Sequence, residues 1–321
     1  MLRHLKVLLE PFVLSLVGAV VLASSLPARG NFATLVDRAA DAGIVLLFFL
    51  HGARLSREAL LDGASNWRLH LATLATTFVL FPIAGLGFAA VPGLSSPLDQ
   101  GLLYLTLLPS TVQSAIALTA VAGGNVAAAV CGASISNLVG IFLTPALVGL
   151  LLESTGDLHV LESVQRIVVQ LLLPFLLGHA LRPLLGAFVT RHKALMTIVD
   201  RGSILLVVYA AFGAAVVDGL WTRVAPADAL LVIVLCVCLF CVILALSWAL
   251  GRALGFARED AIVLQFFGST KSLASGVPMA GVLFPPAAIG GLILPLMLFH
   301  QIQLIACAVV ARRYAQQLER R

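Results

Sequence analysis

Charged side chains are scarce in this sequence. Of its 321 residues only 11% are Asp, Glu, Lys or Arg, whereas 60% are hydrophobic, and the mean hydropathy is +1.07. Soluble domains carry about 25% charged residues, so this composition excludes an ordinary water-soluble globule. The net charge is +5, but the Lys and Arg residues stand singly between apolar runs. That spacing does not suggest a nucleic-acid-binding patch, and we expect the lipid bilayer to be the partner of these residues instead.

Cysteine is also sparse, and the signature motifs of enzymes are missing. No His/Cys/carboxylate spacing suggests a metal site, and there is no nucleophile elbow, Walker loop or zinc-protease signature. We therefore expect no enzyme, no catalytic residue, no cofactor and no ATP-driven pump within this chain. The cysteines fall inside apolar runs, where small-residue packing is the expected role and a disulfide framework is not: Cys131, Cys236, Cys238, Cys241 and Cys307.

Apolar runs long enough to cross a bilayer recur along the whole chain. Lipid offers the backbone no hydrogen-bond partner, so such runs fold as helices. The sequence predicts an all-α polytopic membrane protein with ten transmembrane helices, at residues 9–27, 36–53, 69–91, 98–122, 126–152, 165–187, 197–219, 226–251, 260–284 and 287–311.

The basic residues gather on one side of these predicted spans. The odd-numbered loops carry only Arg29 and Arg223. Because Lys and Arg concentrate in cytoplasmic loops, both termini are expected in the cytoplasm. The residues on that side are Arg3, Lys6, Arg54, Arg57, Arg68, Arg182, Arg191, Lys193, Arg252, Arg258, Arg312, Arg313, Arg320 and Arg321.

The chain also repeats itself at offsets of 150 to 163 residues. This predicts two halves, residues 1–153 with spans one to five and residues 154–321 with spans six to ten. Because each half has an odd number of spans, the second half enters the membrane upside down, which is the inverted-repeat architecture of secondary transporters. The matching pairs are Glu10-Pro-Phe with Leu173-Pro-Phe, Val36-Asp-Arg with Val199-Asp-Arg, Ser110-Thr…Ser114 with Ser269-Thr…Ser272, and Gly140…Pro145 with Gly290…Pro295.

Polar residues interrupt spans four and nine, which correspond in the two halves. Span four reads Leu108-Pro-Ser-Thr-Val-Gln-Ser, and Pro109 cannot donate to the helix ladder. Span nine reads Gly268-Ser-Thr-Lys-Ser-Leu-Ala-Ser-Gly-Val-Pro278, with Gly and Pro bracketing the polar cluster. Broken helices at the midplane are where such transporters bind, because freed carbonyls and helix ends can hold a cation or a carboxylate. A kink repaired by neighbouring helices is the alternative.

Lys271 is the most unusual residue of span nine. Roughly twelve residues of the apolar run flank it on each side, about 18 Å of helix, so its stem cannot reach a head-group layer. An intramembrane cation is a functional-site hypothesis by default. It could replace a transported sodium, attract an anionic substrate, or exchange a proton, because burial disfavours the charged form of an amine. Structural pairing with backbone carbonyls is the fourth possibility.

The predicted substrate- or ion-binding residues lie at or beside the two interruptions. For those of span five, packing and interhelical hydrogen bonds are the alternative role. The set comprises Ser110, Thr111, Gln113 and Ser114 in span four, Ser134 and Asn137 in span five, and Gln265, Ser269, Thr270, Lys271 and Ser272 in span nine. We interpret His300, Gln301 and Gln303 of span ten as packing or cavity-lining groups, and the Asp-Arg pairs Asp37-Arg38 and Asp200-Arg201 as caps and anchors at span ends.

Together with Ala122-Gly-Gly-Asn, the two interrupted segments resemble the bile acid:sodium symporter family (solute carrier ten-like), and most closely its bacterial branch related to the seventh human member. The resemblance covers essentially the whole chain. It implies a core domain from spans 3–5 and 8–10, with discontinuous helices 4 and 9 crossing at the midplane. It also implies a panel domain from spans 1, 2, 6 and 7, with substrate bound between the two domains.

The sequence departs from the sodium-coupled members of that family. They carry an acidic residue just before the second interruption, where this chain has Gln265, and polar residues where it has Ala115, Ala129 and Ala133. These differences, together with the added Lys271, mean that in this interpretation the chain lacks the two-sodium site of the sodium-coupled members. The coupling ion stays open between sodium, a proton and none.

We therefore expect a secondary active transporter of the symporter type. It would move a small organic anion or related metabolite across the bacterial inner membrane by alternating access. The alternative is a non-transporting membrane sensor or regulatory protein on the same fold, which would bind a ligand without flux. The sequence leaves the substrate, the direction of transport and the oligomeric state open.

Overall fold

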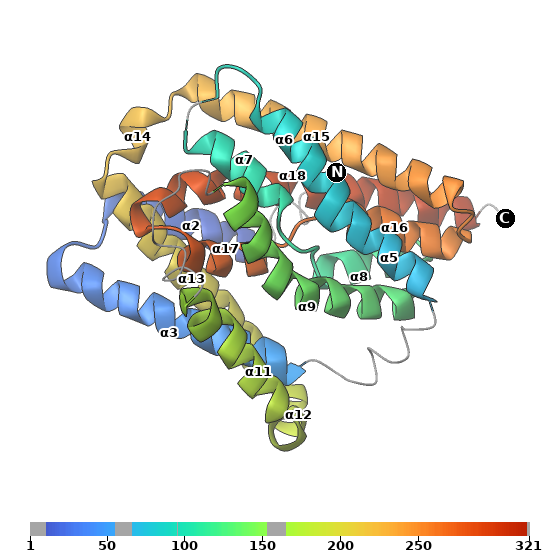
Figure 1. Cartoon of the computed structure of the whole chain (residues 1–321), viewed down its shortest axis with the longest axis horizontal. Helices are drawn as coiled ribbons and strands as arrows, with labels where there is room; N and C mark the ends of the chain where they lie inside the picture. Colours follow the sequence, from blue (N-terminus) through green and yellow to red (C-terminus); the bar gives the residue numbers. More distant parts are fainter. Residues whose placement is uncertain (1–10, 55–65, 95, 153–164, 320–321) are drawn as a thin grey trace. The chain divides into compact units, whose positions relative to one another are not determined.

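A computed structural model describes residues 11–54, 66–94, 96–152 and 165–319, and within these ranges every regular element is a helix (Figure 1). The predicted boundary between the two halves, at residues 153 and 154, lies outside the described residues. So do five of the basic residues used to predict the orientation: Arg3, Lys6, Arg57, Arg320 and Arg321.

Five of the described helices are long and apolar enough to cross a membrane. They are Trp67–Ala89, Val126–Leu151, Lys193–Val217, Pro226–Ala253 and Pro286–Leu318. A sixth is added if the bent pair Gln165–Ala180 and Arg182–Arg191 counts as one span. The protein is thus an all-helical membrane protein, whereas length and composition alone do not yield the predicted ten spans.

The predicted span at residues 165–187 is sharply bent in the structure. The chain bends by 91° between Ala180 and Arg182, at the start of α12 (Arg182–Arg191), which carries a proline in its first turn. Proline favours the first turn of a helix because its missing N–H has no helical acceptor there. A new helix therefore starts at this point, and its direction differs from that of α11 (Leu173–Ala180).

The chain divides into two compact units. The first comprises the described residues of Met1–Leu55, Gly149–Ala225 and Ala274–Ile293. Its helices are α2 (Pro11–Ser25), α3 (Gly30–Arg54), α11, α12, α13 (Lys193–Val217) and α14 (Leu220–Arg223), the π-helix η3 (Val168–Leu172) and most of α17 (Leu273–Leu283). In this unit α3 packs against α11, α12 and α13, and α13 also packs against α2.

Two glycines let α3 and α11 approach each other closely. A Cβ on Gly52 would overlap the carbonyl oxygen of Phe175, and a Cβ on Gly178 would overlap the carbonyl oxygen of Phe49. The contact is reciprocal, because each helix presents a glycine to a carbonyl of the other. Small residues of this kind allow backbone-to-backbone packing of membrane helices, with van der Waals contact as the main stabilising force.

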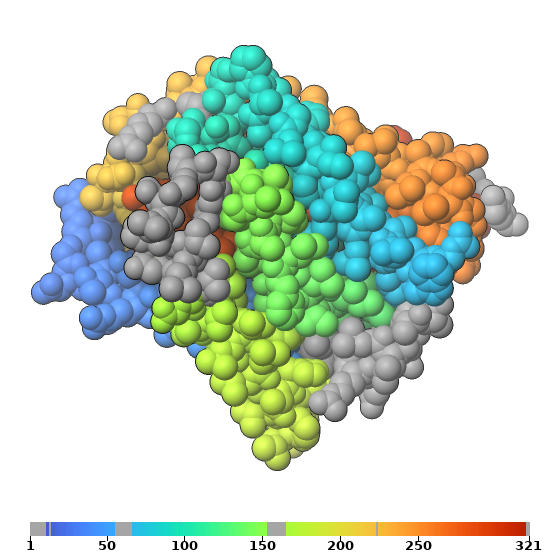
Figure 2. Space-filling view, viewed as in Figure 1, coloured from blue at the N-terminus to red at the C-terminus, as the bar shows by residue number. Residues whose placement is uncertain are grey.

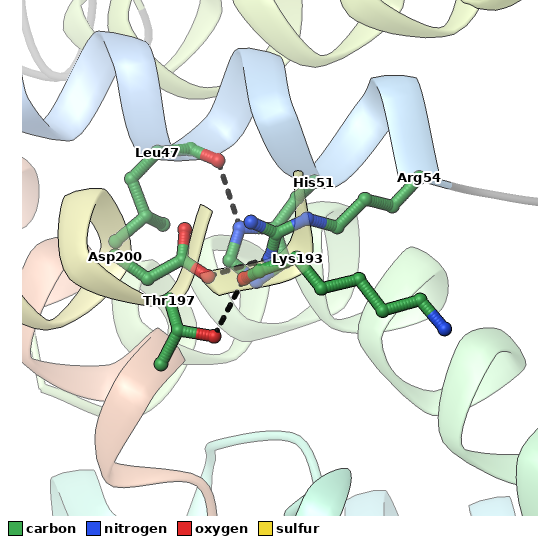
Figure 3. Close-up of polar contacts among 6 residues, drawn as sticks. All are labelled: Leu47, His51, Arg54, Lys193, Thr197 and Asp200. Atoms are coloured by element: carbon green, nitrogen blue, oxygen red, sulfur yellow. Dashed lines mark hydrogen bonds and ion pairs between the residues drawn. The ribbon is translucent and has the colours of Figure 1, made fainter. Parts of the chain in front are cut away.

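A charged pair joins α3 to α13 in the same unit (Figure 3). Arg54 donates to Asp200, and His51 Nδ1 donates to the carbonyl of Leu47 one turn earlier. Asp200 is the eighth residue of α13, which begins at Lys193, so the interpretation of Asp200 and Arg201 as helix caps is wrong. Asp37 and Arg38 lie equally far inside α3. The helices extend beyond the apolar runs because a helix continues through polar residues when nothing stops it.

The second unit comprises the described residues of Ser56–Val148, Pro226–Leu273 and Leu294–Arg321. Its helices are α5 (Trp67–Ala75), the π-helix η2 (Thr76–Leu80), α6 (Phe81–Ala89), α7 (Leu98–Thr106), α8 (Gln113–Val121), most of α9 (Val126–Leu151), α15 (Pro226–Ala253), α16 (Arg258–Ser269) and the later part of α18 (Pro286–Glu319).

Small residues build the core of the second unit. Alanines of α8 and α9 pack with α5 and α16, so that α5 lies beside α9 on the face drawn in Figure 2, and α15 runs along α16 (Figure 1). The cluster consists of Leu69, Ala72, Ala115, Ala128, Ala129, Ala133, Val263, Leu264 and Phe267. Alanine at these positions brings the helices that carry the interruptions close together.

Candidate functional site

Both predicted interruptions are breaks in the helices. In the first, α7 ends at Thr106 and α8 begins at Gln113. In the second, α16 ends at Ser269, Thr270 is extended, and α17 begins at Leu273. The backbone N–H of Ser272 donates to the carbonyl of Pro109 at 2.8 Å, so the two breaks touch each other.

The glycine and proline that bracket the second cluster do not cause its break. Pro278 lies inside α17, and Gly268 lies inside α16, where a Cβ would meet Thr76 and Ser247. Gly268 therefore serves close packing. The break itself coincides with the polar residues Thr270, Lys271 and Ser272.

Lys271 is fully buried in the second unit, and its amine is held by backbone oxygens. Nζ donates to the carbonyls of Thr77 at 2.7 Å, Thr106 at 2.7 Å and Leu108 at 2.8 Å. Carbonyls only accept, and an ammonium group has three N–H donors whereas a neutral amine has two. The three bonds therefore fit the ammonium form. The nitrogen also lies 4.2 Å from the ring centroid of Phe81 and 5.8 Å from that of Phe78, distances typical of cation–π contacts.

The carbonyls of the first break are free to accept because the helix ends there. In a continued helix the Thr106 carbonyl would accept from the N–H of Ser110, but that N–H donates to Ser136 Oγ. Thr144 of α9 donates to the Leu107 carbonyl at 2.8 Å, and Asn137 donates to the Ser110 carbonyl at 3.4 Å. Every carbonyl from residue 106 to residue 110 thus accepts a hydrogen bond. For two of these carbonyls the donor is Lys271 Nζ.

The third carbonyl is freed by a π-turn followed by proline. In η2 the N–H of Phe81 donates to Thr76, five residues back. The Thr77 carbonyl would next accept from residue 82, but Pro82 has no N–H. Since both possible helical donors are excluded, the Thr77 oxygen is left for Lys271. The same order of π-turn and proline occurs in the first unit at η3 and Pro174.

Gln303 of α18 takes the place of the helical hydrogen bonds that Lys271 lacks. Its Oε1 accepts from the Lys271 N–H and its Nε2 donates to the Lys271 carbonyl, both at 2.8 Å. Its Nε2 also lies 2.8 Å from Nδ1 of His300. A primary amide is the side chain that can donate and accept at one backbone residue in this way. Gln303 therefore fixes the backbone from which the ammonium extends.

The hydroxyl groups of the two breaks form one buried cluster. Ser110 Oγ lies 3.0 Å and Thr111 Oγ1 3.4 Å from Thr270 Oγ1, and Ser114 donates to Thr111. Ser136 and Asn137 of α9 bind the backbone of Ser110. The structure thus brings together predicted residues from spans four, five and nine. Among the described residues, no group of three or more His, Cys, Asp or Glu side chains could hold a metal ion.

Other predicted site residues lie apart from the ammonium. Gln113 is exposed at the start of α8, and Ser134 donates to the Val130 carbonyl of its own helix. Ser269 donates to the carbonyl of Gln265, whose side chain accepts from the hydroxyl of Tyr314 at 2.6 Å. The hydrogen bonds described here place none of these four side chains against Lys271 Nζ.

Comparison with known proteins assigns this chain to a family of membrane transporters. The family model of the SBF-like CPA transporter family matches residues 10–316. This chain belongs to that family. It is 51% identical over 314 residues to "Putative symporter YfeH" of Escherichia coli, an alignment that covers 97% of this chain and 95% of the relative.

Further relatives are similar over most of their length. An uncharacterized protein of Pseudomonas aeruginosa is 51% identical over 311 residues, 96% of this chain and 93% of its own. Sodium/bile acid cotransporter 7 of Mus musculus is 26% identical over 276 residues, 83% of this chain and 80% of its own. The resemblance inferred from the interrupted spans is thereby confirmed, and the protein is a multi-pass membrane protein of a transporter family.

Several groups that hold Lys271 in place were not predicted from the sequence. Backbone carbonyls, such as those of Thr77 and Leu108, leave no signature in a sequence. Gln303 was interpreted as a packing or cavity-lining group, although a buried amide in an apolar span needs a hydrogen-bond partner. Pro82 inside span three was a usable signal, because a proline always leaves a carbonyl of the preceding turn without its donor.

Gln303→Leu is expected to destabilise the protein by about 2–4 kcal/mol. It leaves a buried N–H and a buried carbonyl without partners, each at about 1–3 kcal/mol, less whatever the backbone regains by relaxing. Thermal unfolding of the purified protein in detergent measures the loss. The matched control is Gln301→Leu, two residues away on the same helix and only partly buried. Equal unfolding temperatures for the two variants would contradict the role given to Gln303.

Proposed function

We propose that this protein is a secondary active transporter that carries a small organic anion or related metabolite across the bacterial inner membrane by alternating access. Membership of the SBF-like CPA transporter family and the name of the symporter-type relative support transport. The predicted inverted repeat, with helices 4 and 9 crossing at the midplane, is part of this proposal. The contact between Ser272 and Pro109, which joins the two breaks, supports it.

The observation that carries the proposal is the buried ammonium of Lys271 where the breaks meet. Its hydrogen-bonded neighbours are neutral carbonyls, so its positive charge is solvated but not cancelled. In this structure the amine is fully buried and its three N–H groups are bonded to carbonyls, so it makes no direct contact with a substrate. It acts at a distance instead: an anion about 8 Å away gains about 2 kcal/mol at an effective dielectric constant of about 20.

The first test is a thermal-shift screen of the purified protein against small organic anions, followed by flux of each binder into proteoliposomes under imposed ion gradients. A true substrate stabilises the protein by mass action and is also accumulated. Binding without flux under any gradient would contradict transport and favour a sensor. Sodium, potassium and proton gradients are varied one at a time, so that the coupling ion is read from the same experiment.

The second test concerns the charge of Lys271. Lys271→Ala is expected to weaken the affinity for the transported anion by about 30-fold, the equivalent of the 2 kcal/mol above. Lys193→Ala removes an equal charge from an exposed position on α13 and is expected to leave the affinity within twofold. If both variants bind the anion as the wild type does, the electrostatic role of Lys271 is wrong.

A further inference from the structure

The surroundings of the Lys271 amine have the composition of a binding site for a free cation. Three carbonyl oxygens converge on one point, and the face of Phe81 covers it. Phe81 is itself held by an edge contact with Phe299, at 5.9 Å between ring centroids. We call the three carbonyls and the Phe81 ring the cation cage.

The cage is assembled by the backbone and does not depend on the lysine side chain for its shape. The Thr106 and Leu108 carbonyls point inward because α7 ends and Pro109 follows. The Thr77 carbonyl is freed by η2 and Pro82. Thr144, Ser136 and Asn137 of α9 hold the remaining backbone groups of the break. A shorter side chain at position 271 would therefore leave the oxygens close to where they are.

The ligand class follows from distance and charge. The nitrogen–oxygen separations of 2.7–2.8 Å exceed the roughly 2.0–2.6 Å at which magnesium and calcium bind oxygen. The cage itself holds no carboxylate, which divalent ions prefer as ligands. Neutral carbonyls combined with an aromatic face suit a monovalent ion that can make cation–π contacts, and an ammonium ion satisfies both features.

We propose that the cation cage is a binding site for a monovalent ammonium-type cation, and that this chain keeps it permanently filled with its own lysine. The tethered ammonium makes a free cation unnecessary at this position. The wild-type protein is therefore insensitive to the identity of the cation here, and truncating the lysine creates a cation requirement. This inference goes beyond transport, because it concerns cation binding and stability and holds whatever solute is carried.

The experiment uses the full chain in detergent, with Lys271→Ala compared with wild type at constant ionic strength. Chloride salts of ammonium, methylammonium, propylammonium, potassium and sodium are titrated against N-methylglucamine, which is too large for the cage. Lys271→Ala is expected to gain a saturable rise in unfolding temperature of about 5 °C at a hundredfold excess over the dissociation constant. Propylammonium is expected to bind best, because it also fills the volume left by the lysine stem.

Two variants serve as controls. Lys271→Met fills the stem volume without a charge and is expected to show no dependence on the cation. Lys271→Ala combined with Phe81→Leu keeps the carbonyls and removes the aromatic face, and is expected to need at least tenfold more ammonium for the same shift. If Lys271→Ala yields no folded protein without ammonium, recovery of folded protein on adding ammonium to the extraction buffer is the equivalent result.

Three outcomes overturn the proposal. One is a Lys271→Ala protein that responds equally to every salt, N-methylglucamine included. Another is a cation response of the same size in the wild type or in Lys271→Met, which would place the binding elsewhere. The third is failure of both Lys271→Ala and Lys271→Ser to yield folded protein in any of the salts. A failed anion-transport assay, by contrast, leaves the cation response of Lys271→Ala unaffected, so the two proposals are tested separately.

Discussion

Replacement of Lys271 by methionine is expected to lower the free energy of unfolding by about 3–5 kcal/mol. Methionine matches the lysine stem in volume and leaves the carbonyls of Thr77, Thr106 and Leu108 buried without a donor. Each such carbonyl costs about 1–3 kcal/mol when it is left without a donor, and relaxation of the backbone recovers part of the total. The loss is measured by thermal or denaturant-induced unfolding in detergent.

The control for this experiment is Lys193→Met, which removes the same group from an exposed position. That change is expected to stay within about 0.5 kcal/mol of the wild type. An unfolding temperature for Lys271→Met within a degree of the wild type would mean that the carbonyls find other donors. The ammonium would then have no structural role.

The second large effect is expected at the glycine contact between α3 and α11. In Gly178→Ala the new methyl group meets the carbonyl of Phe49 and the backbone N–H of Ala53, so neither neighbour can move aside without moving its helix. Overpacking costs about 1–3 kcal/mol where side chains can adjust, and more where they cannot. We expect a loss of at least about 3 kcal/mol, seen as a sharp fall in folded yield and unfolding temperature.

Gly202→Ala is the matched control, because Gly202 lies on α13 in the same unit and a Cβ added there would meet no atom within 4 Å. Alanine there is expected to be neutral or to stabilise the helix by up to about 1 kcal/mol, since glycine is the poorer helix former. Gly52→Ala, on the opposite side of the contact, is expected to behave like Gly178→Ala. If Gly178→Ala and Gly202→Ala unfold alike, the two helices do not depend on their close approach.

Several features of the fold were predictable because they depend on composition and local chemistry. The scarcity of charged residues indicated a membrane protein. Pro109 and the polar run around Lys271 indicated the two breaks, because proline removes a backbone donor and polar groups bond poorly with lipid. The predicted N-terminal ends of α3 and α13 were wrong, since α3 begins before Asp37 and α13 begins before Asp200. A hydropathy pattern detects the residues that lie in lipid, and a helix can extend beyond those residues.

The sequence by itself determined a helical membrane protein with two interrupted spans and one lysine that must be accounted for. Only the tertiary structure decided what that lysine touches. Its partners are backbone carbonyls of residues far from it in the chain, and Gln303 holds its backbone from another helix. Every residue has a backbone carbonyl, so the identity of a residue does not reveal whether its carbonyl will be left without a donor. That depends on where each helix ends and which neighbour packs against the end.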